Sequence, residues 1–277
     1  MTNLRPSPIA GQWYEGNPKA LARKVDEYLT AAQLPALDGE VVAVIAPHAG
    51  HLYSGAVAGY AFAALRGLSP ELVAVISPMH QPYYELLITT AHDAYSTPLG
   101  NIPVDKDALR ELDVVLKSEL GFGLMSVSRD REHSLEIELP FLQRVFQSKW
   151  KLLPVMVRAQ EPRVSEGLGR ALAQVLRNKN FALVASTDLS HFYDQKTANM
   201  LDAEMLRRFE SLDPDSLFDA ERTGKGFACG HAAVAAVLWA ARELGADKVQ
   251  ILHHATSGDV TGDMSSVVGY GAAAVLR

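Results

Sequence analysis

The chain has 277 residues, of which 48% are hydrophobic and 21% are charged, a composition typical of an ordinary globular protein. Its net charge of −6 provides no basic surface for nucleic acid or for an anionic membrane. No apolar run approaches the roughly 18 residues needed to span a bilayer, and the first 16 residues lack the apolar segment of a signal peptide. The single cysteine, Cys229, excludes an internal disulfide framework. We therefore expect a cytoplasmic protein.

The first predicted elements lead to two histidines. Asn17 and Pro18 are typical of a helix start, and residues 19–30 continue as an amphipathic helix. An apolar strand over residues 41–46 is followed by Pro47 and His48. After an alanine-rich helix over residues 55–65, a second apolar strand over 72–77 ends before His80.

Two apolar strands joined by a helix form a βαβ unit, in which the strands are parallel. The carboxyl ends of both strands then lie at one edge of the sheet, so His48 and His80 can converge. Two converging imidazoles are half of a transition-metal site. The alternative is that each histidine only forms a hydrogen bond to a nearby loop.

The middle of the chain adds a third histidine. A strand over 86–90, a loop over 95–104 and a helix over 106–116 precede it. His133 then lies before a predicted helix over 135–146 that contains Pro140. His133 is either a functional group or a partner of the first helical turn. Glu136 and Glu138 form no His-Glu-x-x-His pattern, and we expect them to be solvated or ion-paired.

A third strand, over residues 181–186, also ends in polar residues, following a strand over 151–157 and a helix over 164–176. Asp188 and His191 lie just beyond it, and a carboxylate next to a histidine can fix its tautomer. A Ser190-His191-Asp188 hydrolase triad is disfavoured, because the chain has no Gly-x-Ser-x-Gly motif.

Cys229 precedes an alanine-rich helix over residues 232–244. The helix dipole there favours a thiolate, which suits a nucleophile or a metal ligand; the alternative is a buried apolar residue. Between the last strands, over 249–253 and 266–276, a glycine-rich loop over 257–262 lacks the lysine spacing of a phosphate-binding loop.

These elements predict a single α/β domain over residues 1–277, with a mostly parallel or mixed sheet covered by helices. We expect one rim of the sheet to gather six chemically active residues: His48, His80, His133, Asp188, His191 and Cys229.

Seven ordered motifs also resemble those of a known family. They are Ala-Pro-His-Ala-Gly (46–50), Ser-Pro-Met-His (77–80), Tyr-Ser-Thr-Pro-Leu-Gly (95–100), Glu-His-Ser-Leu-Glu-Ile-Glu-Leu-Pro-Phe (132–141), Ser-Thr-Asp-Leu-Ser-His (186–191), Ala-Cys-Gly (228–230) and Thr-Ser-Gly-Asp (256–259). This series resembles the Memo family, also called AmmeMemoRadiSam system protein B. That family is similar in structure to the class III extradiol (LigB-type) dioxygenases, so the resemblance implies a LigB-like fold.

The resemblance also implies roles for the site residues. His48, His80 and Cys229 match the family's metal ligands, and His133, Asp188 and His191 match polar residues of its cleft. We expect His133 and His191 to transfer protons, with Asp188 orienting one of them. Iron or copper is the implied metal, with zinc as a further option; a thiolate ligand favours the softer ions.

The function implied by the resemblance is that of a non-haem, metal-dependent oxidoreductase acting on an unidentified substrate. Two alternatives come from the same source: a module that binds a small molecule or a peptide in the metal cleft without turnover, or an accessory protein that works with a radical SAM protein and an AMMECR-type protein. His51 replaces a tyrosine common in the family, and His231 follows the cysteine motif, so either could join the site.

Overall fold

The computed structural model describes residues 3–277. Its main sheet has the strand order β10-β12-β2-β9-β3-β8-β4-β7, with β11 paired to the other side of β12. Four central strands are parallel: β2 (Val41–Ala46), β9 (Phe181–Ser186), β3 (Leu72–Pro78) and β8 (Lys151–Val157). The outer pairings make the sheet mixed, because β12 (Val267–Leu276) and β4 (Leu87–Thr90) run antiparallel to their inner neighbours.

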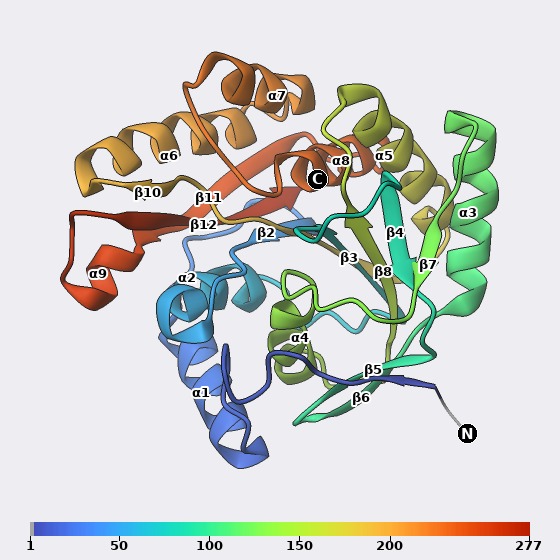
Figure 1. Ribbon diagram of the computed structural model, residues 1–277, viewed down its shortest axis with the longest axis horizontal. Coiled ribbons are helices and arrows are strands. Elements are labelled where there is room, and N and C mark those ends of the chain that lie inside the picture. Colours follow the sequence, from blue (N-terminus) through green and yellow to red (C-terminus); the bar gives the residue numbers. More distant parts are fainter. Residues whose placement is uncertain (1–2) are drawn as a thin grey trace.

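The valine-rich central strands are buried on both faces, as their continuous apolar sequences predict. On one face, α2 (His51–Ala63) packs on the sheet and is covered by α1 (Pro18–Ala31) and α4 (Leu139–Val145). On the other face lie α8 (His231–Glu243), α5 (Pro162–Leu176) and α3 (Lys106–Leu120), as Figure 1 shows. The predicted α/β architecture with a helix-covered mixed sheet is confirmed.

The remaining elements lie around the rim of this core. Helices α6 (Gln195–Glu210) and α7 (Pro214–Thr223) follow β10 (His191–Tyr193), and β11 (Lys248–Thr256) leads through α9 (Ser257–Thr261) to β12. At the opposite end, β7 (Met125–Val127) pairs with β4. A small separate sheet is formed by β1 (Leu4–Arg5), β5 (Ala94–Thr97) and β6 (Gly100–Pro103).

Three local predictions are wrong. Residues 95–104, expected to be a loop, contain the β5–β6 hairpin. The glycine-rich segment over 257–262 forms α9, because Thr256 and Asp259 make a capping box and Gly262 ends the helix at a φ of 78°. The helix expected over 135–146 begins as a 3₁₀ turn, η1 (Glu136–Glu138), and Pro140 lies in the first turn of α4, where its missing N–H is tolerated.

The parallel strands place their carboxyl ends at one edge, as predicted for the βαβ unit. His48 follows β2, His80 follows β3 and Asp188 follows β9, which inserts between those two strands. Within residues 3–277, no helix is both long and apolar enough to cross a membrane.

Candidate metal centre

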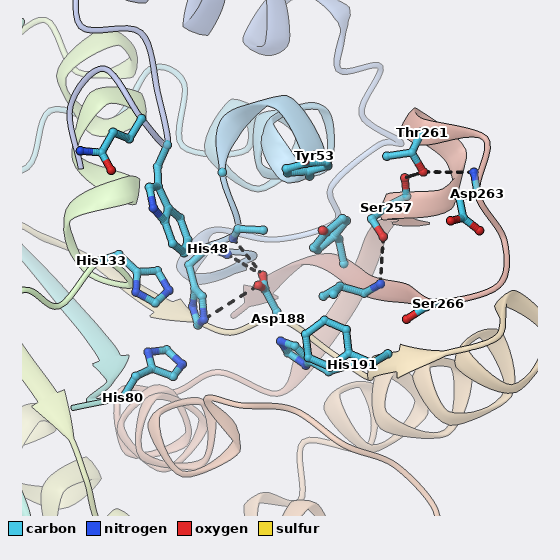
Figure 2. A pocket seen from close by; sticks show the side chains of 17 residues that line it. His48, Tyr53, His80, His133, Asp188, His191, Ser257, Thr261, Asp263 and Ser266 are labelled. Carbon is cyan, nitrogen blue, oxygen red and sulfur yellow. Dashed lines mark hydrogen bonds and ion pairs between the residues drawn. The ribbon is translucent and has the colours of Figure 1, made fainter. Parts of the chain in front are cut away.

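Three imidazoles meet at this carboxyl edge of the sheet. His48, His80 and His133 each offer a ring nitrogen, and these three atoms lie within 4.8 Å of one another. The rings of His80 and His133 are stacked, with centroids 4.8 Å apart, and the His48 ring meets both edge-on. Figure 2 shows the three side chains converging from three different segments.

Glu132 fixes two of these histidines. Its carboxylate accepts hydrogen bonds from Nδ1 of His80 at 2.8 Å and from the His80 amide at 2.6 Å. The same carboxylate accepts the amide of His133 at 3.0 Å, and Nδ1 of His133 lies 3.3 Å away. Although burial opposes ionisation, the hydrogen bond and charge of His80 lower the pKa of Glu132 to about 2. Glu132 is therefore an anion at neutral pH and leaves Nε2 of His80 free to bind a metal.

Ser186 fixes the third histidine. Its hydroxyl lies 2.8 Å from Nδ1 of His48, so Nε2 of His48 is turned toward the cluster. Burial holds the pKa of His48 well below its usual range, and the imidazoles of His133 and His80 lower it further. Burial also lowers the pKa of His133 to about 4. Neutral imidazoles carry the lone pairs that metal ions require, so the donor set fits a transition-metal ion.

Cys229 lies beside this cluster and outside the set of three close donor atoms. Its Sγ is 3.0 Å from Nε2 of His48 and accepts the amide hydrogen of Asp188 at 3.3 Å. The close approach depends on Gly230, since a Cβ there would lie 2.3 Å from the Ser186 carbonyl oxygen. Burial raises the pKa of the Cys229 thiol, and the nearby Asp188 carboxyl raises it further. In the metal-free protein the thiol is therefore less acidic than a free cysteine, contrary to the expectation from the following helix.

The Asp188 carboxylate accepts its hydrogen bonds from backbone amides. One carboxylate oxygen accepts the amides of His48 at 2.7 Å and Ala49 at 3.2 Å, and the other lies 4.0 Å from Nε2 of His48. Burial raises the pKa of Asp188 to about 7, while the two amide hydrogen bonds oppose that rise. Nδ1 of His191 is bound by the Leu189 carbonyl at 2.8 Å. Among the described residues, Asp188 therefore makes no hydrogen bond to His133 or His191, which it was expected to orient.

The histidine cluster opens into a cavity of about 650 Å³. Its apolar walls come from Trp13, Tyr53, Phe192 and Tyr270, and His191 and Asp188 lie along it. The ring of Trp13 covers His133, with the two ring centroids 4.2 Å apart. At the end lined by α9 and the following loop, the lining is polar and includes Ser257, Thr261, Asp263 and Ser266.

Neither extra histidine lines this cavity. His51 is buried, donates from Nε2 to the Ile137 carbonyl at 3.1 Å, and packs against Phe141. His231 lines a second cavity of about 360 Å³, together with Cys229, His191 and Glu221. Cys229 thus lies between the histidine cluster and a separate opening.

The structure brings the six predicted residues to one region and adds partners that the sequence analysis missed. Glu132, Ser186 and Trp13 contact the cluster directly; Glu132 and Ser186 each begin one of the quoted motifs, whereas Trp13 lies outside all of them. Glu136 forms an ion pair with Arg5, which was one of the two outcomes expected for this residue. Glu138 is fully buried against Ser186 and so is not solvated, and within residues 3–277 it forms no ion pair.

The fold and site together define an α/β protein with a histidine-rich candidate metal centre at the carboxyl edge of its sheet. The family model described as "Memo-like protein" matches residues 5–274, and the chain belongs to the Memo family. It is 34% identical over 274 residues to a "MEMO1 family protein" of Nitrosopumilus maritimus, covering 97% of this chain and 98% of that one. Similar proteins of Methanothermobacter thermautotrophicus and Thermotoga neapolitana are also 34% identical, each over 96% of this chain and 98% of theirs.

Proposed function

We propose that this protein binds one transition-metal ion through His48, His80 and His133 and acts as a non-haem oxidoreductase. The observation that carries the proposal is the cluster of three imidazoles whose Nδ1 atoms lie against Glu132 and Ser186. When bound, iron or copper supplies Lewis acidity and redox chemistry, and zinc supplies the former alone. The resemblance of the chain's motifs to the Memo family, and through that family to the LigB-type dioxygenases, supports the same class of reaction.

The protein's own residues supply binding and proton transfer. The aromatic walls of the 650 Å³ cavity suit a small molecule with an apolar or planar body, held with one end at the histidine cluster. His191 and Asp188 line the cavity beside the cluster, and burial lowers the pKa of His191, so its neutral ring can accept a proton from a bound substrate. Cys229 would serve as a fourth ligand once its thiol has lost its proton to the solvent.

The apolar cavity also supports a second candidate function. A ligand-binding module needs the same walls and no turnover, and a small molecule or a peptide side chain would fit between Trp13 and Phe192. As a member of a radical SAM system, the protein would act beside a radical SAM protein and an AMMECR-type protein in the cytoplasm. Co-purification of either protein with this chain would support the accessory role.

Metal analysis tests the proposal first. Protein purified without oxygen should carry close to one metal ion per chain, and His80→Ala or His133→Ala should lower metal affinity at least about tenfold. His253→Ala is the matched control, since His253 stacks on Tyr60 outside the cluster. Unchanged metal affinity in both cluster variants contradicts the site.

Oxygen uptake with catechols then separates the two functions. An oxidoreductase consumes oxygen in a metal-dependent way, and this uptake should be lost in His80→Ala. A binding module holds its ligand and releases it unchanged, with no oxygen consumed.

A further inference from the structure

Glu138 is a buried carboxyl group close to the candidate metal centre that the proposed function does not use. It lies in η1 and is 0% exposed. One of its oxygens, Oε1, is 2.7 Å from the Ser186 hydroxyl, and the other, Oε2, has no hydrogen-bond partner within residues 3–277. In the same described part of the chain, Glu138 has no ion pair with a lysine, arginine or histidine; Arg5 pairs with Glu136 and Asp130.

Such an environment favours the neutral acid. A buried carboxylate without a cation loses its hydration and gains no ion pair in return. Burial accordingly raises the pKa of Glu138 well above its usual range, and the charge of Asp188 adds to the rise, while the Ser186 hydrogen bond opposes it. Asp188 is the ionisable neighbour that acts on Glu138 directly.

The hydrogen bonds around Ser186 indicate where the Glu138 proton lies. The Ser186 oxygen is 2.8 Å from Nδ1 of His48, 2.8 Å from the Ser134 carbonyl and 2.7 Å from Glu138. The hydroxyl has one hydrogen, so it cannot donate to both Ser134 and Glu138. If it donates to the carbonyl, a protonated Glu138 can donate to the Ser186 oxygen, and every close contact is satisfied.

We propose that Glu138 is a carboxylic acid in the metal-free protein and releases its proton when a metal cation is bound by His48, His80 and His133. This inference rests on the proposed metal site and deepens it. The cation and the neutral acid become a cation and a carboxylate, and one proton passes to the solvent. The Ser186 hydroxyl then turns from Ser134 to the Glu138 carboxylate, while it continues to accept from Nδ1 of His48.

The physical reason is charge compensation. The buried site gains a positive charge when the metal binds, and charges interact more strongly there than in water. A carboxylate two hydrogen bonds from a ligand imidazole offsets that charge and makes the imidazole a better donor. Metal binding is therefore coupled to the release of one proton from Glu138, in addition to any proton lost by Cys229 or Asp188.

Glu138→Gln is the test variant, because glutamine has the shape of the neutral acid and can donate to Ser186 but cannot become an anion. Zn²⁺ binding is measured by calorimetry at pH 7 in buffers of different ionisation enthalpy, which counts the protons released. The wild type should release about one proton more than Glu138→Gln, and its Zn²⁺ affinity should be about 10–100-fold higher. The exposed Glu119→Gln variant should match the wild type.

A second measurement does not depend on the variant. The infrared spectrum of the wild type should contain a protonated-carboxyl band that Zn²⁺ removes, and Glu138→Gln should lack that component. Equal proton counts in wild type and Glu138→Gln, or a carboxyl band that Zn²⁺ leaves unchanged, overturn the role of Glu138 while the metal site stands. If the wild type does not bind Zn²⁺, iron or copper at the cluster, the proposed function fails and this inference fails with it.

Discussion

Single residues around the candidate metal centre differ in what they contribute. The three imidazoles provide the donor atoms, but two carboxyl groups decide how those imidazoles are presented. Glu132 is ionised and accepts hydrogen bonds from His80 and His133. Glu138 lies beyond Ser186 in an environment that favours its neutral form. The same side-chain type thus has opposite protonation preferences within one site because its hydrogen-bond partners differ.

Replacing Glu132 tests whether its hydrogen bonds to His80 and His133 contribute to metal affinity. Glu132→Gln keeps the shape but loses the negative charge that the His80 and His133 rings face, and an amide nitrogen cannot accept the His80 amide hydrogen. We expect metal affinity to fall about 10–100-fold, with little change in the free energy of unfolding of the metal-free protein beyond the lost hydrogen bond. Competitive Zn²⁺ titration against a chelator measures the affinity, with Glu119→Gln as the control. Wild-type affinity in Glu132→Gln would show that the histidines need no such support.

Cys229 shows where a rule about one residue type fails. A cysteine before a helix is expected to be acidic because the helix amides favour its thiolate. The structure confirms the helix, but the sulfur is buried and faces the Asp188 carboxyl, and both effects raise the pKa of the thiol. Sequence shows the helix start and cannot show the desolvation, which depends on segments far from Cys229 in the chain.

At the scale of elements, the strand ends were the most predictable feature. Valine-rich runs before His48 and His80 identify buried parallel strands, and parallel strands must end at one edge. The insertion of β9 between β2 and β3 could not be read from those two strands, since β9 begins at residue 181. That insertion brings Ser186 and Asp188 against His48.

Short elements were less predictable because their stability comes from tertiary contacts. The β5–β6 hairpin is anchored by β1 from the start of the chain, and nothing within residues 95–104 specifies that pairing. Helix α9 depends on the capping box of Thr256 and Asp259, and the glycines of this segment favour a loop prediction instead. Both elements lie outside the regular core, where local sequence patterns carry the least information.

The start of helix α2 allows a prediction about pH. His51 is 4% exposed, and burial lowers its pKa to about 4, although the hydrogen bond that it donates to the Ile137 carbonyl opposes this shift. Between pH 6.5 and pH 4 the unfolded chain binds a proton at this residue that the folded protein does not, so the free energy of unfolding must fall as the pH falls. At pH 5 the loss from His51 is about 2 kcal/mol, from 1.4 kcal/mol per pH unit.

His51→Gln removes this titration and keeps a donor for the Ile137 carbonyl. Urea unfolding of the metal-free proteins at pH 7.5, 6.5, 5.5 and 5 measures the effect. The stability of the wild type relative to His51→Gln should decline by about 2 kcal/mol across this range. Parallel pH curves for the two proteins would mean that His51 titrates normally in the fold.

At the scale of the whole molecule, the candidate site is assembled from both ends of the chain and its middle. Trp13 covers His133, and the backbone of Trp13 accepts the amide of His51 at 2.8 Å. The family motifs brought attention to six residues of one rim, but no local pattern links residue 13 to residue 133. Such long-range partners follow from the complete topology and from no single segment.

Arg5 forms several of these long-range contacts. Its guanidinium is buried, donates to Asp130 at 2.6 Å and to the Glu132 carbonyl at 2.8 Å, and pairs with Glu136. It therefore ties the first strand to the segment that supplies Glu132 and His133. Arg5→Met leaves Asp130 and Glu136 buried without their cation, which typically costs about 3–5 kcal/mol.

We expect Arg5→Met to lower the free energy of unfolding of the metal-free protein by about this amount and also to weaken Zn²⁺ binding, because the segment from Asp130 to Glu136 loses its anchor. Urea unfolding and Zn²⁺ titration at pH 7.5 measure the two effects. Arg23→Met is the matched control: Arg23 is exposed on α1 and, in the described part of the chain, forms only a 3.8 Å surface pair with Glu27, so its loss should change stability by less than about 0.5 kcal/mol. A destabilised Arg5→Met protein with wild-type Zn²⁺ affinity would show that the metal site keeps its shape without the first strand. Because Glu132 also holds His80 and His133 through its own carboxylate, comparing Arg5→Met with Glu132→Gln separates the anchoring of the segment from the presentation of the imidazoles.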